Sequence, residues 1–249
     1  MAEIKRRALL AGLAALPAAA CSRMGESETA GSIFDAAEDW HRIAHRTLAN
    51  RQALAPEYAP EDRSPDIRGN GSRTVDTPQY RTSLANGFAD WRLEVRGLVA
   101  NPLSLTMADL RALPQRTQIT RHDCVEGWSA IAEWSGPQLS QLLDSAGLLP
   151  EAKFIIFRCA DRLYGRDYYE SIDMVDAYHP QTIIAHALNG EPLPEKNGAP
   201  LRVRIERQLG YKHAKYLTAI EAVESFEDLY AGKGGFWEDI GDYQWYAGI

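Results

Sequence analysis

Short strand-like segments, separated by few helical ones, dominate the sequence after residue 78 and limit the class of fold that it can adopt. Residues 91–99 alternate apolar and polar side chains as a half-buried strand does, and residues 201–205 alternate again. Residues 154–159 form an almost continuous apolar run, which is typical of a buried strand. The regular strand–helix–strand rhythm of a dinucleotide-binding domain is missing, and the sequence has no G-x-G-x-x-G and no P-loop. We therefore expect an α+β fold of mixed β-sheets with few helices.

Composition along the chain predicts four parts. Residues 1–20 have the pattern of an export signal peptide, and residues 21–31 are small and polar, as in a linker. Residues 32–77 hold a helical pattern beginning at Ser32, followed by a Pro- and Gly-rich stretch without periodicity that we expect to wrap the domain. Residues 78–249 would then form the main domain.

The first twenty residues predict export to the periplasm. Three basic residues, Lys5-Arg6-Arg7, precede the apolar run from Ala8 to Ala20, which ends in the small residues that a signal peptidase requires. The run is shorter than the ~20 residues of a membrane-spanning helix, so we expect no transmembrane segment in the mature chain. The arginine pair favours the twin-arginine route, with the Sec route as the alternative. Cys21 is a candidate site for a lipid anchor.

The overall charge argues against two classes of partner. The chain has a net charge of −7 and a pI near 5.4. Nucleic acids and anionic membranes are bound through an excess of Lys and Arg, so neither is expected here. A local basic pocket for a small anion remains compatible with this composition.

One cysteine, in the stretch RHDCVEGWSA (residues 121–130), has four possible roles: buried small hydrophobe, half of a disulfide, nucleophile or metal ligand. A thiolate is favoured by nearby cationic groups, and Arg121 and His122 are its close neighbours in sequence. The mature chain would retain one other cysteine, Cys159, and in an oxidising compartment a Cys124–Cys159 disulfide is the default structural interpretation.

Positive charge is concentrated between residues 189 and 215. Asn-Gly occurs twice in ten residues, which predicts tight turns leading into a strand that carries Arg202 and Arg204. A loop, Gly210-Tyr-Lys-His-Ala-Lys215, follows and could offer backbone N–H groups and ammonium charge to a phosphate. In an acidic protein, this concentration suggests that the region binds an anion.

The segment CVEGWS, followed by A-x-W-x-G-x-x-L (residues 124–139), resembles the molybdenum-binding segment of the sulfite oxidase family of molybdopterin oxidoreductases. Other stretches resemble the family in the same order: WRLEVRGLVANP, LNGEPLPEKNGAPLRVRI, GYKHAKYLTAIEAV and GFWEDIGDYQWYAGI. The resemblance covers roughly residues 78–249. It is nearest to the exported bacterial branch that includes the catalytic subunit of protein methionine sulfoxide reductase. It implies a sulfite-oxidase-type molybdopterin-binding fold and a Mo-molybdopterin cofactor.

The resemblance also implies roles for single residues. Cys124 would be the thiolate ligand of molybdenum. Its cationic neighbours in sequence, Arg121 and His122, are candidate catalytic groups. The residues that match cofactor-binding positions of the family are Asn70, Asn197, Arg202, His213, Ala214 and Lys215. Cys159 stands at a further cofactor position, where the reductase branch has threonine. A second departure is Gly71-Ser72-Arg73, which replaces the aromatic and acidic pair that follows the upstream asparagine in that branch.

Two substrate classes remain open at this point. An anion such as sulfite would be attracted by Arg121, Arg166 or His122, whereas a neutral sulfoxide would favour an aromatic mouth, for which the candidates are Trp128, Tyr168 and Tyr169. The sequence has no C-x-x-C-H, so we expect no c-type haem in the chain and a separate electron partner, either a cytochrome or a haem-containing membrane subunit. The alternative from another class is a non-catalytic binding protein on the same scaffold, with a Cys124–Cys159 disulfide.

Overall fold

The computed structural model describes residues 28–48 and 50–249, and the chain divides into two units at Asn50 and Arg51. The first unit contains one helix, α2 (Glu28–Leu48). This helix begins at Glu28 rather than at Ser32, so residues 28–31, expected to belong to the linker, are helical. The predicted export signal, Cys21 and the rest of the linker lie outside the described residues. Among the residues described, no helix has the length and apolarity needed to cross a membrane.

The second unit begins at Arg51, earlier than the expected boundary at residue 78. Its first segment runs along the sheet formed by β3 (Gln115–Cys124) and β4 (Trp128–Pro137) and contains one short helix, η1 (Pro60–Asp62). The backbone N–H of Tyr58 donates to Ile119 O (2.9 Å), and that of Ser64 donates to Ile131 O (2.9 Å). The segment is thus hydrogen-bonded to both strands.

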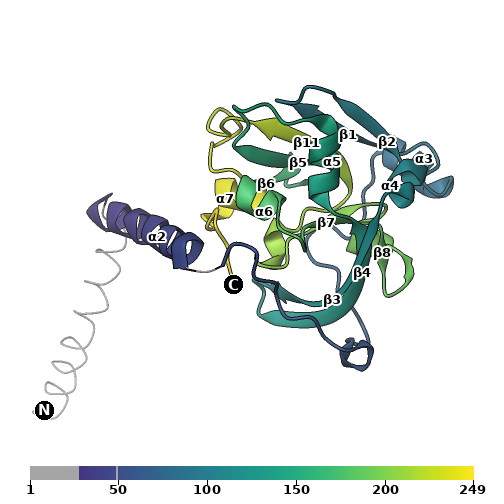
Figure 1. Cartoon of the computed structure of the whole chain (residues 1–249), viewed down its shortest axis with the longest axis horizontal. Coiled ribbons are helices and arrows are strands. Elements are labelled where there is room, and N and C mark those ends of the chain that lie inside the picture. Colours follow the sequence, from purple (N-terminus) through teal and green to yellow (C-terminus); the bar gives the residue numbers. More distant parts are fainter. Residues whose placement is uncertain (1–27, 49) are drawn as a thin grey trace, which may run out of the picture. The chain divides into compact units, whose positions relative to one another are not determined.

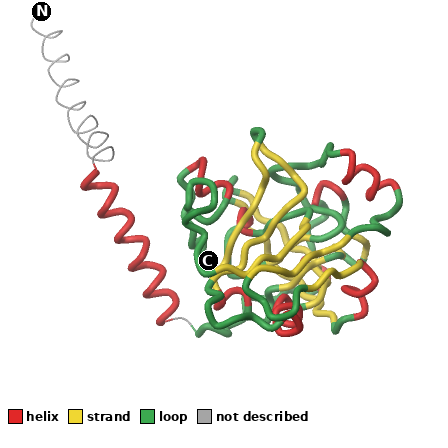
Figure 2. The backbone as a smooth tube through the Cα atoms, turned by 90° about the horizontal axis from the view of Figure 1, so that it is seen from above, coloured by secondary structure: helices red, strands yellow, loops and turns green. Residues whose placement is uncertain are grey.

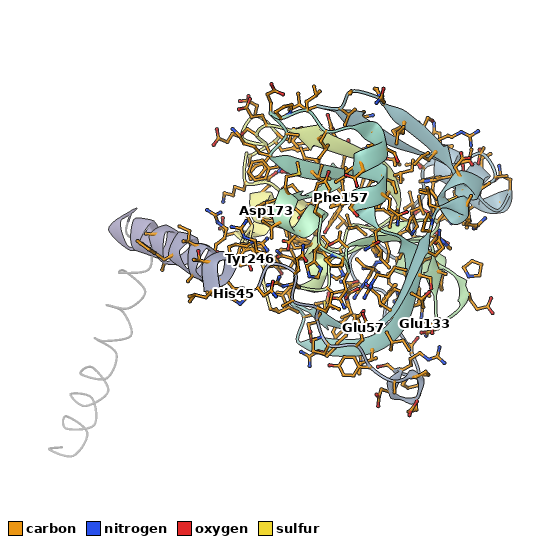
Figure 3. The ribbon with its side chains drawn as sticks, viewed as in Figure 1. His45, Glu57, Glu133, Phe157, Asp173 and Tyr246 are labelled. Atoms are coloured by element: carbon orange, nitrogen blue, oxygen red, sulfur yellow. The ribbon has the colours of Figure 1, made fainter. Side chains whose placement is uncertain are left out.

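The larger sheet has the strand order β2-β1-β11-β5-β6 (Figure 1). Its strands are β1 (Arg92–Gly97), β2 (Leu103–Thr106), β5 (Phe154–Leu163), β6 (Arg166–Asp173) and β11 (Leu217–Val223). Only β1 and β11 pair in parallel; the other neighbours are antiparallel. The apolar run from Phe154 explains the position of β5 between β11 and β6, where Phe157 is fully buried among packed side chains (Figure 3).

Three short helices accompany this sheet: α3 (Pro78–Ala85), α4 (Met107–Ala112) and α5 (Leu139–Ala146). The expected helix after Thr106 forms, since Thr106 and Asp109 cap it reciprocally. The helix expected over 137–148 is shorter, because Pro137 still belongs to β4 and Gly147 ends the helix at φ 66°. Leu139, Leu142 and Leu143 of α5 enter the same core as β1 and β5.

The second sheet has the order β3-β4-β8-β9, with β8 (Ala187–Leu188) and β9 (Glu191–Pro192) at its edge. Beside it lies a two-stranded sheet of β7 (Ile183–Ala185) and β10 (Arg202–Arg204). β4 and β7 approach closely at Gly136, where a Cβ would lie 2.0 Å from Ile184 O. A side chain larger than hydrogen would separate the two layers.

The remaining elements are short and lie between strands: α6 (Met174–Ala177), η2 (Glu195–Asn197), η3 (Gly210–Lys212) and α7 (Phe236–Gly241). Strands predominate and helices are few in the second unit (Figure 2). The expected α+β class with mixed sheets is therefore confirmed. The loops that leave β3, β5 and β10 converge on one side of the molecule, and they form the site described next.

Candidate active site

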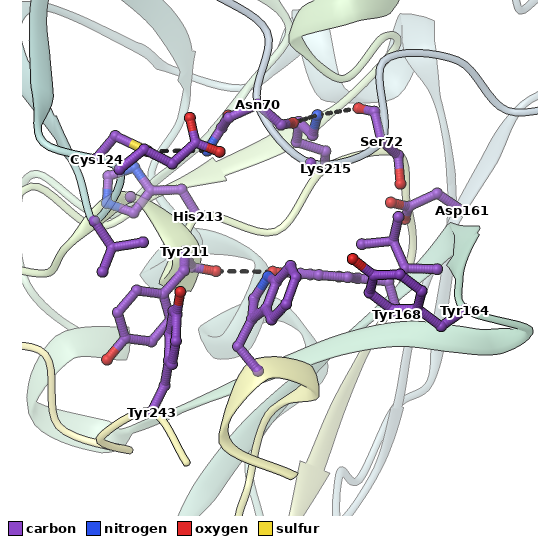
Figure 4. Close-up of a pocket in the computed structure, with 16 residues that line it drawn as sticks. Asn70, Ser72, Cys124, Asp161, Tyr164, Tyr168, Tyr211, His213, Lys215 and Tyr243 are labelled. Atoms are coloured by element: carbon purple, nitrogen blue, oxygen red, sulfur yellow. Dashed lines mark hydrogen bonds between the residues drawn. The ribbon is translucent and has the colours of Figure 1, made fainter. Parts of the chain in front are cut away.

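A pocket of about 340 Å³ opens between the β3–β4 turn, the segment after Gly69, the β5–β6 hairpin, η3 with the loop after it, and α7 (Figure 4). Its interior side chains are buried, and they belong to parts of the chain far apart in sequence. They are Ser72, Cys124, Asp161, His213 and Lys215.

Cys124 reaches this pocket because it ends a regularly alternating strand. Along β3 the buried positions are Gln118, Thr120, His122 and Cys124, so the thiol faces inward. Asn70 Nδ2 lies 3.6 Å from Cys124 Sγ, as a donor to the sulfur. Burial is the main reason that the pKa of this thiol is raised. A cation at the sulfur would reverse that effect, since a coordinated thiol is deprotonated.

Arg121 does not belong to the site. The same alternation that turns Cys124 inward turns Arg121 to the opposite face of β3, where its side chain is 53% exposed and paired with Asp123 at 2.9 Å. The expectation of a catalytic Arg121 is therefore not supported by its position. Period-two alternation alone would have excluded it.

Lys215 lines the interior of the pocket and binds the backbone of the segment that forms one wall. Its ammonium group donates to Asn70 O (2.6 Å) and to Ser72 O, which fixes the segment that carries Asn70 beside Cys124. Burial, and then the charge of Arg202, lower the pKa of Lys215 to about 7. The ammonium group therefore lacks an anionic partner sufficient to offset its desolvation.

Asn197 and Arg202 lie directly behind this wall and are fully buried, although they do not line the pocket. Arg202 Nη1 donates to Asn197 O (3.1 Å), and Nη2 donates to His213 O (3.2 Å). Asn197 Nδ2 lies 3.4 Å from both Ile67 O and Arg68 O. The two residues thereby join the segments that carry Asn70 and His213.

His122 and Arg204 form a second buried polar layer. Arg204 Nη1 lies 2.7 Å from His122 Nδ1, while its Nε and Nη2 donate to Glu206. The His122 ring packs edge-on against His213 at 5.2 Å. Burial, followed by the charge of Arg204, lowers the pKa of His122 well below its usual value, so the ring is neutral. His122 supports the pocket from behind and does not line it.

Asp161 is a pocket residue that the sequence did not indicate. The β5–β6 pairing shifts register between Arg158 and Arg162, and this irregularity turns Asp161 into the pocket opposite Cys124 (Figure 4). Burial raises the pKa of its carboxyl group, and its Oδ1 makes no hydrogen bond within the described part of the chain. No motif could have predicted it, because the register shift appears only in the folded sheet.

The mouth of the pocket is aromatic and half-exposed. Trp237 of α7 packs edge-on against Tyr164 at 6.3 Å and stacks on Tyr243 at 5.7 Å. Tyr168 also lines the pocket, and its hydroxyl donates to Tyr211 O (3.0 Å). Of the other candidates named from sequence, Trp128, Tyr169 and Arg166 do not line it.

Ala214 lies next to the pocket residues His213 and Lys215, whereas Cys159 lies on β5 and is not a lining residue. Ala214 is buried between Lys215 and His213, and its carbonyl accepts from Val203 N–H (2.9 Å). Cys159 lies beside β11, paired in register with Leu217, and does not line the pocket. Both Cys124 and Cys159 are free thiols, so the alternative built on a disulfide between them is not supported.

A buried ion cluster holds the loop that carries His213. Lys212 Nζ lies 2.7 Å from Glu170 Oε2 of β6 and is also paired with Glu238 of α7. All three side chains are buried. One ammonium group thus connects a strand, the η3 loop and the helix that supplies Trp237.

Comparison with known proteins identifies relatives of this arrangement. The sequence model of the family described as "oxidoreductase molybdopterin binding domain" matches residues 78–230. A chain of Azospira oryzae described as a putative protein-methionine-sulfoxide reductase subunit, YedZ1, is 45% identical over 160 residues, covering 64% of this chain and 56% of that protein. The protein-methionine-sulfoxide reductase catalytic subunit MsrP of Campylobacter jejuni is 30% identical over 177 residues, covering 64% of this chain and 60% of that protein.

A similar fold occurs in the crystal structure of the sulfane dehydrogenase SoxCD from Paracoccus pantotrophus. The TM-score is 0.51 at 25% identity, covering 60% of this chain and 45% of that chain. This chain therefore spans somewhat more than half the length of the curated relatives that it matches and less than half of the SoxCD chain.

The residues present fit a molybdopterin group. Three buried polar atoms behind and within the pocket make no hydrogen bond in the described part of the chain. They are Asn197 Oδ1, Arg202 Nε and His213 Nδ1. Buried polar atoms are nearly always paired, so unpaired atoms gathered at one site indicate a ligand. An anionic phosphate matches Arg202 and Lys215, polar ring edges match the amide and carboxyl groups, and a soft thiolate matches molybdenum.

Proposed function

The chain belongs to the family of oxidoreductase molybdopterin-binding domains, and on that premise we propose that it catalyses the reduction of a neutral sulfoxide, of the methionine sulfoxide type. The single observation that supports this proposal is the mouth of the pocket. Among the lining residues within the described part of the chain, none is an arginine, and the exposed side is formed by aromatic and acidic groups such as Tyr164, Trp237 and Glu126. A sulfite dianion would be repelled there, whereas a neutral sulfoxide would not.

We assign the cofactor-holding residues from the buried contacts and the unpaired polar atoms of the site. Cys124 supplies the protein thiolate, and Asn70, held by Lys215, donates to its sulfur. Arg202 and Lys215 supply positive charge for the phosphate end, the neutral His213 ring supplies an unpaired nitrogen, and Asn197 supplies an unpaired amide oxygen. Ala214 contributes backbone only, and we assign Cys159 no direct part because its side chain packs against the hydrophobic core.

The reaction consumes two electrons and two protons, since R₂SO + 2 e⁻ + 2 H⁺ gives R₂S and H₂O. When bound, the cofactor supplies the oxygen-atom and electron chemistry. The chain's own residues orient the substrate, exclude water and hold the cofactor. His122 and His213 are neutral because of burial, so they add no competing positive charge at the sulfur of Cys124.

The electrons come, on this proposal, from a separate haem protein, because no haem-binding C-x-x-C-H occurs in the sequence. The periplasm is the proposed location, supported by the basic and apolar pattern of residues 1–20. Mass spectrometry of the mature N-terminus would test export, with cleavage near Ala20 expected. A lipid on Cys21 would appear as an added acyl mass.

A substrate panel tests the proposed reaction. Protein produced in a molybdenum-replete host, supplied with a reduced viologen dye, should reduce methionine sulfoxide and dimethyl sulfoxide. With an oxidising dye and sulfite, turnover should be at least ~100-fold lower in kcat/KM, because the mouth offers no cation to the dianion. Sulfite oxidation at the higher rate would replace the proposed function with the second substrate class.

A further inference from the structure

The aromatic residues at the pocket mouth form a continuous cluster with a defined geometry. Tyr164 contacts Trp237 edge-on (80°), Trp237 stacks on Tyr243 (23°), and Tyr243 contacts Tyr211 edge-on at 5.0 Å. All four rings belong to residues that line the pocket. We call Tyr164, Trp237 and Tyr243 the aromatic rim.

Tyr164 lies in the rim because it belongs to a two-residue hairpin turn. It and Gly165 are the two turn residues between β5 and β6, both with positive φ (48° and 78°). Such turns favour Asn-Gly, because a bulky side chain at positive φ is disfavoured. A tyrosine there costs stability, and its ring is 79% exposed, so core packing does not offset that cost.

The rim lies on the exposed side of the pocket, whereas Cys124, Asp161 and Lys215 lie inside it. A substrate as small as dimethyl sulfoxide would be enclosed by the interior. Groups attached further from the sulfur would extend past the mouth, where aromatic faces attract apolar and peptide groups. Charge supports a neutral or cationic substrate segment, because Glu126 also lines the pocket and is exposed.

We propose that the aromatic rim is the specificity-determining surface for the substrate, and that it binds the peptide chain on either side of a methionine sulfoxide residue. This inference rests on the proposed function and deepens it. The interior determines which atom reacts, whereas the rim determines that the sulfoxide is presented on a polypeptide. Tyr164 is a binding residue here and has no part in the chemistry at the sulfur of Cys124.

The test uses Tyr164→Asn, with Tyr164→Phe and Tyr230→Asn as controls. Asparagine is compatible with positive φ, so Tyr164→Asn should fold at least as well as the wild type. Tyr230 is matched to it: it has φ 54°, it is 52% exposed, and it does not line this pocket. Molybdenum content should be equal in all four proteins.

For a short peptide that contains methionine sulfoxide, Tyr164→Asn should raise KM about tenfold at unchanged kcat, because the rim binds ground and transition states alike. Kinetic constants for dimethyl sulfoxide should stay within about twofold. Both controls should match the wild type. An equal loss for dimethyl sulfoxide, or an equal loss in Tyr230→Asn, would overturn the inference.

Binding without turnover separates this inference from the proposed function. Calorimetric titration of the oxidised holoprotein, with no electron donor, should show the same tenfold loss of affinity for the peptide in Tyr164→Asn. If the peptide binds through Tyr164 but is never reduced, the proposed function is refuted, whereas the inference that the rim binds the peptide is supported. If the wild type does not bind the peptide, or binds it no better than Tyr164→Asn, the rim inference is refuted whatever the protein reduces.

Discussion

Lys215 shows at the scale of one residue how the site favours an anion. Its ammonium group is buried and donates hydrogen bonds to two backbone carbonyl oxygens. It also lies close to the positive charge of Arg202. Two dipoles do not replace the hydration of a full charge. Burial and the charge of Arg202 therefore lower the pKa of Lys215, and this has a measurable consequence.

In protein produced without the cofactor, stability should rise with pH above about 7. The pKa of Lys215 is about 7 in the folded state and ordinarily 10.5, so between these values the unfolded chain binds more protons. The free energy of unfolding then increases with pH across that window. Denaturant titration should show a smaller rise in Lys215→Met, whereas Lys153→Met, at an exposed pair with Glu224, should keep the wild-type slope. Equal slopes in all three proteins would contradict the assignment.

The two cysteines of the described chain should behave differently. Cys124→Ser should lower kcat by at least ~10³-fold, because the soft thiolate is the only protein ligand proposed for the metal. Cys159→Ser should keep kcat within about threefold, since its side chain does not line the pocket. Molybdenum content and steady-state reduction of methionine sulfoxide check both variants. Comparable losses in the two would place Cys159 at the cofactor after all.

At the scale of elements, β6, η3 and α7 are joined by the buried cluster of Lys212 with Glu170 and Glu238. Lys212→Met would leave two carboxyl groups buried without a cation. We expect a loss of about 3–5 kcal/mol in the free energy of unfolding, against less than ~1 kcal/mol for the exposed pair removed by Lys153→Met. Chemical denaturation measures both. If Lys212→Met loses no more than Lys153→Met, the cluster does not hold the loop.

The same cluster has a predicted pH dependence of its own. Burial, followed by the charge of Glu238, raises the pKa of Glu170 well above its usual 4.5. The folded state then binds the proton more tightly than the unfolded chain, so this contribution to stability is complete below pH 4.5 and is lost as pH rises through the raised pKa. Glu170→Gln should remove that decline. A decline of unchanged slope in the variant would show that another group causes it.

The sequence predicted those elements that depend on local signals. The capping pair Thr106 and Asp109, the apolar run from Phe154 and the alternation around β1 each encode their own structure. β7 and the small strands β8 and β9 were not predicted, because they are two or three residues long and depend on pairing with other strands. β6 was not predicted either, and it forms by pairing with β5. The boundary at Arg51 escaped prediction for the same reason: residues 51–77 have no periodicity, and they join the domain through bonds to β3 and β4.

The sequence proposed candidate residues where a family pattern marks them, and it gave no signal for pocket residues that only the fold brings together. Asn70 and Cys124, far apart in sequence, lie 3.6 Å apart, so the fold brings these two candidate residues to one site. Arg121 was placed wrongly because nearness in sequence was taken for nearness in space. Asp161 and Trp237 were missed, since a register shift and a late helix bring them to the pocket.

At the scale of the whole molecule, an acidic chain buries several basic side chains at one place. The net charge is −7, yet Arg202, Arg204 and Lys215 are all buried behind or within one pocket. Charge on the surface determines which partners approach, whereas charge in the interior determines what is held. The arrangement suits an enzyme that retains an anionic cofactor, and it is compatible with the neutral substrate that we propose.

A single-turnover experiment tests this account most directly. Holoprotein, reduced with dithionite and freed of excess reductant, is mixed with methionine sulfoxide, and both molybdenum and the methionine formed are measured. We predict about one molybdenum per chain and about one methionine per molybdenum, with no product from Cys124→Ser. Active protein without molybdenum, or molybdenum-loaded protein that oxidises sulfite and leaves methionine sulfoxide unchanged, would contradict the proposal.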